Sequence, residues 1–185
     1  NNIKADDAFS VASNISNLMF ENISNLHYDE KAGTLVDRFD GNKGTIVTVF
    51  DAAYSIEALR IFQRAIDALP VGYGSADGAK SLETEQGKRA LSLIKTQADF
   101  LIKNVKDKNG LYFATYDIKT GAKTGIEIGT QFAVVRGLTA AFLATQDKKY
   151  REEARKLFVS IEKNMFDKKI GTYVDASKEY TPYSI

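Results

Sequence analysis

The sequence predicts an all-α protein built from antiparallel helical hairpins in two layers. Five stretches show apolar residues at helical spacing, and these stretches alternate between amphipathic and apolar on nearly every face. A similar glycine-containing turn follows each amphipathic stretch. This alternation is expected when outer helices, which keep one solvated side, alternate along the chain with inner helices that are covered on most sides.

The first hairpin pairs an amphipathic helix with an apolar one. Apolar residues recur every three or four positions over 7–26, while Asn and Ser fill most other positions. The stretch 45–69 carries apolar side chains on nearly every face, which predicts a buried inner helix, and Pro70 ends it. Three glycines in 71–80 predict a loop.

The second hairpin repeats this order. The stretch 82–105 has one apolar stripe, and 126–145 is apolar on most faces. The last predicted helix, 148–165, has an apolar stripe opposite a charged, solvated face. These elements divide one domain, 1–185, into a first hairpin (about 7–70), a linker (71–81), a second hairpin (about 82–146) and an outer helix with its turn (147–185).

The three turns after the amphipathic helices are alike. Gly33, Gly110 and Gly171 each follow an Asp by three or four residues, and β-prone residues come next. The sequences of the two apolar helices can also be aligned with each other, and in this alignment Phe62 corresponds to Phe142. A unit of helix, glycine turn, strand-like loop and inner helix, about 60–80 residues long, indicates an array of helical hairpins.

Composition excludes several kinds of site. With no Cys, thiolate metal sites, thiol catalysis and disulfides are impossible, and a Ser-His-Asp triad would need His27, the single histidine. We expect His27 to be a surface or helix-end residue. The 25 basic and 24 acidic residues leave no charge surplus for nucleic acid, and no apolar run reaches the roughly 20 residues of a membrane span.

No cofactor or metal motif is complete. Lys43-Gly44-Thr45 resembles the end of a phosphate loop, but Arg38 and Phe39 stand where the upstream glycine is required. The run Asp40-x-Asn42-x-Gly44 lacks the remaining ligands of a calcium loop. The sequence therefore predicts neither a cofactor nor a bound metal.

The turns, the helix start at 129–133 (GTQFA) and the helix junction at 147–150 (DKKY) resemble the α/α-toroid superfamily, the six-hairpin glycosidase-like fold. The resemblance covers most of 85–185 and, more weakly, 10–70. Barrels of this superfamily commonly act on glycans as hydrolases, lyases or epimerases, with carboxylates in a cleft lined by aromatic residues. The resemblance thus implies a glycan partner, and it leaves open whether the chain catalyses or only binds.

The chain departs from the superfamily in hairpin number. A toroid has six hairpins, whereas this sequence predicts two and an outer helix, with Thr181-Pro182 as the start signal of a next helix. It would then be a fragment of a longer protein, a toroid completed by another copy in a homo-oligomer, or a smaller domain. No signal-peptide pattern follows Asn1, and the composition suits an extracytoplasmic protein, slightly favoured, or a cytosolic one.

We expect the functional site at the N-terminal end of the inner helices, where unpaired N–H groups favour anionic groups. The catalytic candidates are acidic residues that would form an acid–base pair: Asp37, Asp40, Asp51 and Glu127. The substrate-binding candidates are Tyr54, Tyr112, Tyr116 and Gln131. The structural alternative makes the acidic residues turn and helix-dipole residues, with the tyrosines packed in the rim.

Two functions follow from these candidates. A glycan-handling domain, catalytic or binding, requires the four carboxylates to converge on one pocket with tyrosine walls. A non-catalytic helical scaffold that binds protein, or packs against a missing part of its own chain, requires an exposed apolar face where the absent inner helix should dock and oligomers that depend on concentration. Arg60, Arg64 and Arg136 lie on otherwise apolar helices, so we expect partners for them such as Glu57 or Glu127.

Overall fold

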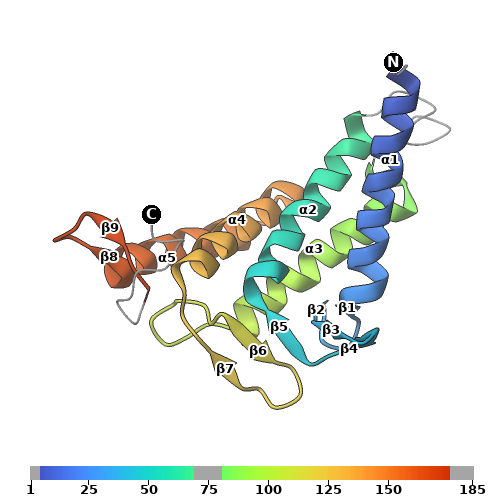
Figure 1. Cartoon of the computed structure of the whole chain (residues 1–185). Helices are drawn as coiled ribbons and strands as arrows, with labels where there is room; N and C mark the ends of the chain where they lie inside the picture. Colours follow the sequence, from blue (N-terminus) through green and yellow to red (C-terminus); the bar gives the residue numbers. More distant parts are fainter. Residues whose placement is uncertain (1–4, 69–80, 176–185) are drawn as a thin grey trace.

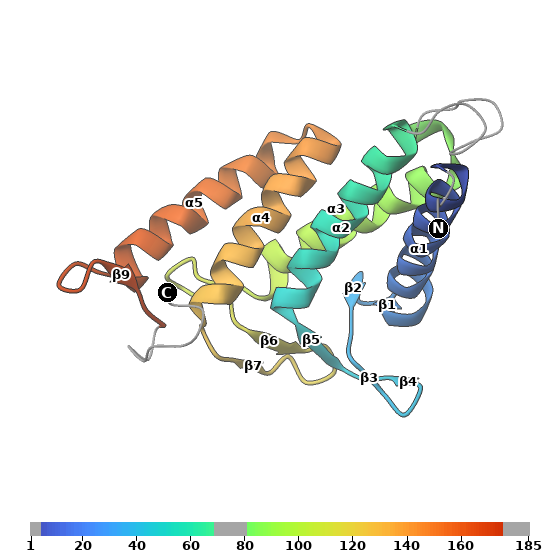
Figure 2. The ribbon, with the colours of Figure 1, turned by 45° about the horizontal axis from the view of Figure 1, so that its top comes forward.

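The computed structural model describes residues 5–68 and 81–175, and the predicted start signal at Thr181-Pro182 lies outside them. In the described part, α2 and α4 lie side by side, α3 packs against both, and α1 and α5 flank the two ends of the layer (Figure 1, Figure 2). The all-α class and the order outer, inner, outer, inner, outer are confirmed. The α-helices are α1 (Ala5–Glu21), α2 (Val49–Ala68), α3 (Glu85–Asn104), α4 (Ile128–Thr145) and α5 (Lys148–Met165).

The first two helices differ in detail from the sequence prediction. The first helix continues past α1 as a wider π-helical segment, η1 (Asn22–His27). The second helix begins at Val49, whereas 45–69 was predicted, because Ile46–Thr48 forms strand β5. β-branched residues in this run favour a strand, and β5 pairs antiparallel with β6 (Thr115–Asp117) from the other hairpin.

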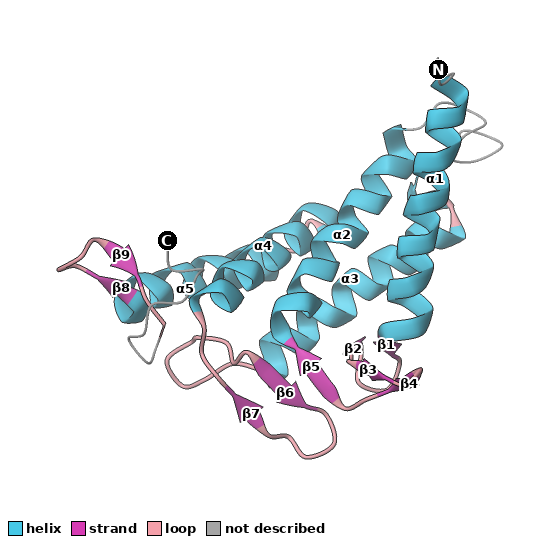
Figure 3. Cartoon of the chain, viewed as in Figure 1, coloured by secondary structure: helices cyan, strands magenta, loops and turns pink. Residues whose placement is uncertain are grey.

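Short antiparallel strands follow the outer helices α1, α3 and α5 (Figure 3). A three-stranded sheet, β5-β6-β7, joins the two hairpins, and the other strands form two-stranded hairpins. The remaining bounds are β1 (Tyr28–Asp29), β2 (Thr34–Leu35), β3 (Arg38–Phe39), β4 (Asn42–Lys43), β7 (Lys123–Thr124), β8 (Phe166–Asp167) and β9 (Thr172–Tyr173); a single 3₁₀ turn, η2 (Ser81–Glu83), precedes α3.

The turns after the three outer helices share one geometry. Gly33, Gly110 and Gly171 have positive φ angles of 73°, 81° and 69°. The aspartate before each glycine accepts main-chain N–H bonds of 2.8–2.9 Å through its carboxylate. Three residues after each glycine, a main-chain N–H donates back to the end of the outer helix at 2.8–3.0 Å. Asp and Gly therefore play the turn role that the sequence predicts.

The inner helices approach each other closely. A Cβ atom at Gly137 of α4 would lie 2.7 Å from the carbonyl oxygen of Ala53 on α2. Two residues after Ala53, the Ser55 hydroxyl donates to Ala52 O and to Gln97 Oε1 of α3, both at 2.8 Å. Gln97 is fully buried. Small residues at this crossing let the helix backbones meet, and buried polar groups nearby are satisfied.

Gly137→Ala is expected to lower the free energy of unfolding by about 1–3 kcal/mol, because its methyl group has to displace the α2 backbone. Chemical denaturation measures the change. Thr139→Ala, an exposed position on the same helix, is the matched control and should change stability little. Equal stability of Gly137→Ala and the parent chain would contradict the close approach.

A glutamate bound by two lysines connects α5 to the segment after α3. Glu153 of α5 binds Lys106 and also Lys156, the latter at 2.8 Å. Burial would raise the pKa of the Glu153 carboxyl, but the two lysines outweigh burial and hold this pKa below its usual value. Stability from such a group is present above the unfolded-state pKa, about 4.3, and is lost as pH falls through the lower folded-state pKa.

Glu153→Gln is therefore expected to lower the free energy of unfolding at pH 7 by on the order of 1 kcal/mol, since the pair is partly solvated. The deficit should shrink as pH falls below about 4, where the parent carboxyl also becomes protonated. Urea unfolding at pH 7 and at lower pH tests both statements. Glu152→Gln, exposed on the same helix, is the control, and a deficit that does not depend on pH would refute the charge argument.

Candidate functional site

A hollow of about 360 Å³ lies at the N-terminal end of α2. It brings together two of the four predicted carboxylates, Asp37 and Asp51, with the predicted aromatic Tyr54. Its walls come from η1, from the segment after β2, and from β5 and the first turns of α2. The lining residues are Ile23, His27, Leu35, Val36, Asp37, Thr48, Asp51, Tyr54 and Ser55.

Local hydrogen bonds fix Asp37 at the edge of this hollow. Its main-chain N–H donates to Ile46 O at 2.8 Å, and its carboxylate Oδ1 accepts from Ile46 N at 2.9 Å. Its carbonyl oxygen accepts from Gly44 N at 2.8 Å. A side chain at position 44 would collide with this carboxylate, because a Cβ there would lie 2.1 Å from Oδ1. Gly44 therefore leaves room for the Asp37 carboxylate.

Tyr54 presents a held aromatic face. Its ring stacks on Phe50 with a centroid separation of 4.8 Å, and it is 41% exposed. The guanidinium of Arg136 on α4 lies 5.0 Å from the ring centroid and donates to the phenolic oxygen at 3.0 Å.

The same guanidinium binds Glu57 on α2 at 2.8 Å, as predicted for Arg136. The hydrogen bond to Glu57 and the charge of this carboxylate raise the pKa of Arg136. These contacts restrict the side chains of Tyr54 and Arg136. They also connect the exposed sides of α2 and α4 beside Tyr54. Arg60 and Arg64 lie elsewhere, around a hollow of about 120 Å³ that Asp67 and Leu143 also line.

Two of the predicted carboxylates do not line the hollow, so the expected convergence of all four is wrong. Asp40 lies in the exposed turn between β3 and β4, with a φ angle of 48°. Its place is that of a turn residue, which is the structural alternative for this position. Glu127 is exposed directly before α4 and makes no side-chain capping bond to the helix.

Gln131 and Tyr112 form an internal connection in place of a binding surface. Both are fully buried. Gln131 Oε1 accepts from Tyr112 N at 2.8 Å, and its Nε2 donates to Tyr112 O at 2.7 Å and to Glu127 O at 3.1 Å. Burial, with the charge of Glu153 nearby, raises the pKa of the Tyr112 phenol. Neither residue offers a surface to a ligand, and this corrects their predicted role.

Tyr116 is half-buried on β6. Its ring meets Phe100 edge-on at 5.5 Å, and the Lys123 ammonium lies 5.8 Å from its centroid. It is not among the residues that line the hollow around Tyr54. The predicted aromatic walls thus reduce to Tyr54 at this hollow.

His27 is a lining residue that the sequence analysis did not place at the site. It ends η1 as a helix-end residue, and its Nδ1 lies 3.2 Å from the Val36 carbonyl oxygen. The available signal was its position directly before the first glycine turn, since that turn folds back beside the start of α2. Across the described ranges, no three His, Cys, Asp or Glu side chains gather in a way that could hold a metal ion.

α4 is the one described helix with the length and composition of a membrane span. Half of it is buried inside this fold, as expected for an inner helix of the hairpin layers. The sequence predicted no membrane span. By length and composition alone, α4 could form one.

The layered hairpins have the arrangement of an incomplete α/α toroid, and solved structures share this fold. The chain is similar to a sugar epimerase from a ruminal bacterium (TM-score 0.69, 19% identity, 95% of this chain and 42% of that one). It is also similar to cellobiose 2-epimerase from Bacillus thermoamylovorans (0.63, 15%, 97% and 47%) and to an α-amylase from Clostridium perfringens (0.58, 15%, 94% and 46%).

The chain spans less than half the length of these three proteins. At such identities the likeness shows the fold, and the resemblance that the turns indicate is confirmed at that level. No family model and no curated protein sequence matches the chain.

Gln131→Ala is expected to lower the free energy of unfolding by about 3 kcal/mol, because it leaves the buried N–H and C=O of Tyr112 without their partners. Hydrogen exchange at the Tyr112 amide should accelerate along with this loss. Gln146→Ala, an exposed glutamine after α4, is the control. A Tyr112 amide that stays protected in Gln131→Ala would show that the side chain is not its partner.

Proposed function

We propose that this chain is part of a carbohydrate-handling α/α toroid that binds a sugar at the N-terminal end of α2. The observation that carries the proposal is the hollow in which Asp51 and Tyr54 lie together, beside the Tyr54–Arg136–Glu57 contacts. An aromatic face of restricted mobility and a few polar groups at its edge are the usual elements of a small-molecule site.

In this proposal Tyr54 supplies the face for a sugar ring, and Asp51 accepts hydroxyl hydrogen bonds. Asp51 lies in the first turn of α2 and lines the hollow. His27 and Asp37 also line the hollow. Support at the level of the fold comes from the sugar epimerases and the α-amylase that share it.

If the toroid is catalytic, carboxylates are the expected acid–base groups, with a hydrolase, lyase or epimerase as the enzyme class. Asp51 and Asp37 both line the hollow, and Asp51 is the better placed of the two, because the Asp37 carboxylate already accepts the main-chain N–H of Ile46. Asp40 and Glu127 would reach a ligand at this hollow only if the ligand extended beyond it.

Sugar titration followed by NMR tests the proposal, with cellobiose and maltotriose as the two probes. Tyr54→Ala should weaken binding by roughly tenfold, since it removes the stacking face, and Asp51→Asn should weaken binding less. Phe158→Ala is the control, because Phe158 is 44% exposed on α5, away from the hollow. The site would be refuted if the NMR chemical-shift changes did not map to the lining of the hollow, or if Tyr54→Ala bound the sugars with unchanged affinity.

The scaffold function is the second candidate, and a specific observation favours it. Large apolar side chains on the α1 side of the molecule are exposed: Val11, Ile15, Leu18, Met19 and Leu26. A face of this kind marks a protein contact. The two functions are compatible, because the apolar face and the sugar hollow are formed by different residues.

A further inference from the structure

A groove with a volume of about 410 Å³ lies between α4 and α5, which run side by side (Figure 2). Its lining includes Val135 and Thr139 of α4 and, on α5, Arg151, Arg155 and Phe158. The three α5 residues follow one another at intervals of four and three positions, so they lie along one face of the helix. With a rise of 1.5 Å per residue this row is about 10 Å long.

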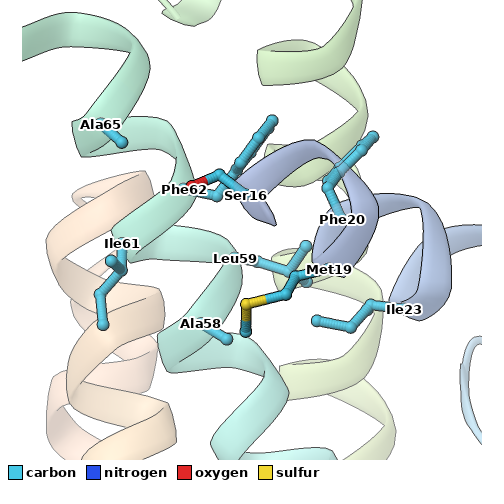
Figure 4. Close-up of a pocket in the computed structure, with 9 residues that line it drawn as sticks. All are labelled: Ser16, Met19, Phe20, Ile23, Ala58, Leu59, Ile61, Phe62 and Ala65. Atoms are coloured by element: carbon cyan, nitrogen blue, oxygen red, sulfur yellow. The ribbon is translucent and has the colours of Figure 1, made fainter. Parts of the chain in front are cut away.

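The lining of this groove differs in charge from that of other hollows. The hollow of about 150 Å³ between α1 and α2 is lined by apolar side chains, with Ser16 as its polar residue (Figure 4). The hollow at Arg60 and Arg64 also has two arginines one turn apart, but the carboxylate of Asp67 lies in its lining. In the α4–α5 groove, two cations and several apolar side chains come together, and none of the described lining residues is acidic.

The two arginines of the groove are not neutralised. Within the described ranges, Arg155 forms no hydrogen bond or ion pair, and Arg151 has only a cation–π contact, with its guanidinium carbon 5.1 Å from the ring centroid of Phe142. By contrast, Arg89 and Arg136 each bind a glutamate. Like charges one turn apart on a helix repel each other, so an anion bound between Arg151 and Arg155 would be stabilising.

No nearby carboxylate is left to play this part. Glu152 and Glu153 act on Lys156, and Glu162 accepts a hydrogen bond from Tyr173. α4 carries no acidic residue at all. Since α5 has six basic residues and three acidic ones, this edge of the molecule is positive, although the whole chain has a net charge of only +1. The local field therefore attracts anions.

The guanidinium groups are the hydrogen-bond donors that the groove offers. Thr139 Oγ1 donates to Val135 O at 2.7 Å, so its proton is already engaged within α4. A guanidinium has five N–H donors in a planar fork and binds phosphate oxygens in pairs. Two arginines supply two positive charges, and a phosphate monoester carries about 1.5 to 2 negative charges at pH 7. Such a group balances the pair better than a single carboxylate does.

The other end of the groove is apolar. Phe158 and Val159 of α5 are 44% and 65% exposed, and Val135 of α4 is half-buried. An aromatic ring of a ligand could contact Phe158 edge-on or in an offset stack. A free inorganic anion would leave these apolar side chains uncovered, so the lining favours a ligand in which the anionic group is joined to an apolar body.

We propose that the α4–α5 groove binds a phosphate monoester of an aromatic or aliphatic group. The phosphate lies between Arg151 and Arg155, and the apolar group lies against Phe158. The contact with Phe142 holds Arg151 in place before the ligand arrives, which reduces the entropy lost on binding. The groove shares no lining residue with the sugar hollow at Asp51, so this inference does not rest on the proposed function.

Titration of the full chain followed by NMR tests the proposal, with phenyl phosphate as the probe. Chemical-shift changes should map to the lining of the groove. Inorganic phosphate lacks the ring and benzyl alcohol lacks the charge, so each should bind at least about tenfold more weakly. Shift changes that are absent, or that spread over the lysines of the whole surface, would overturn the proposal. Benzoate that binds as tightly as phenyl phosphate would overturn the choice of a phosphate.

Variants of the two ends of the groove make the test specific. Arg155→Gln should weaken phenyl phosphate binding by roughly tenfold, because it removes a charged hydrogen-bond donor. It should leave the unfolding temperature nearly unchanged, since Arg155 is exposed and unpaired within the described ranges. Phe158→Ala should weaken the binding of phenyl phosphate and leave that of inorganic phosphate unchanged. Equal effects of Phe158→Ala on the two probes would exclude the contact with the ring.

Arg64→Gln is the matched control, because Arg64 is also exposed and also lies one turn from another arginine. It removes the same charge from the chain and should keep the affinity for phenyl phosphate. If Arg64→Gln and Arg155→Gln weakened binding equally, only the net charge of the chain would matter, and the groove would not be the site. Cellobiose should bind Arg155→Gln as it binds the parent chain, because Arg155 does not line the sugar hollow.

Discussion

The close crossing of α2 and α4 is the contact on which the rest of the structure depends. Gly137 lets the α4 backbone reach Ala53 of α2, and every other described helix packs directly on one or both members of this pair. The crossing sets the spacing of the inner layer, and that spacing decides how α3 fits against both helices. It also brings Arg136 on α4 within reach of Tyr54 and Glu57 on α2. Packing of two small residues thereby fixes the geometry of a polar cluster that neither helix could form alone.

Much of this fold could be predicted from the sequence because helical periodicity is a local signal. Apolar spacing gives the extents of α3 and α4 to within three residues and that of α5 in full. The caps Thr84 and Asp147 lie next to their helices in the chain, so the exact starts of α3 and α5 also have a local cause. Strand β5 could not be separated from α2, since Ile46 and Val47 are apolar in either case. What makes these residues a strand is β6, about seventy positions away, and periodicity carries no information on such a partner.

The site shows the same division between local and distant causes. Tyr54 and Asp51 were identifiable because a single helix presents both on its first turns. Tyr112 and Gln131 looked equally suitable by residue type, but they bind each other across the α3–α4 connection and are buried. Polarity alone therefore does not separate a ligand-binding amide from one that satisfies a neighbouring backbone. His27 reaches the hollow only because the turn at Gly33 folds back toward α2.

The pairing of β5 with β6 has a consequence for how this array loses its structure. Hairpin arrays commonly unfold unit by unit, because each unit contacts only its neighbours. Here the strand before α2 and the strand after α3 share a ladder, and Val49 at the start of α2 donates to Ala114 beside that ladder. Fraying at this junction cannot release one hairpin without exposing backbone groups of the other. The sheet thus couples the two units into one cooperative block, while α1 at the edge, with few contacts to α2, is free to open on its own.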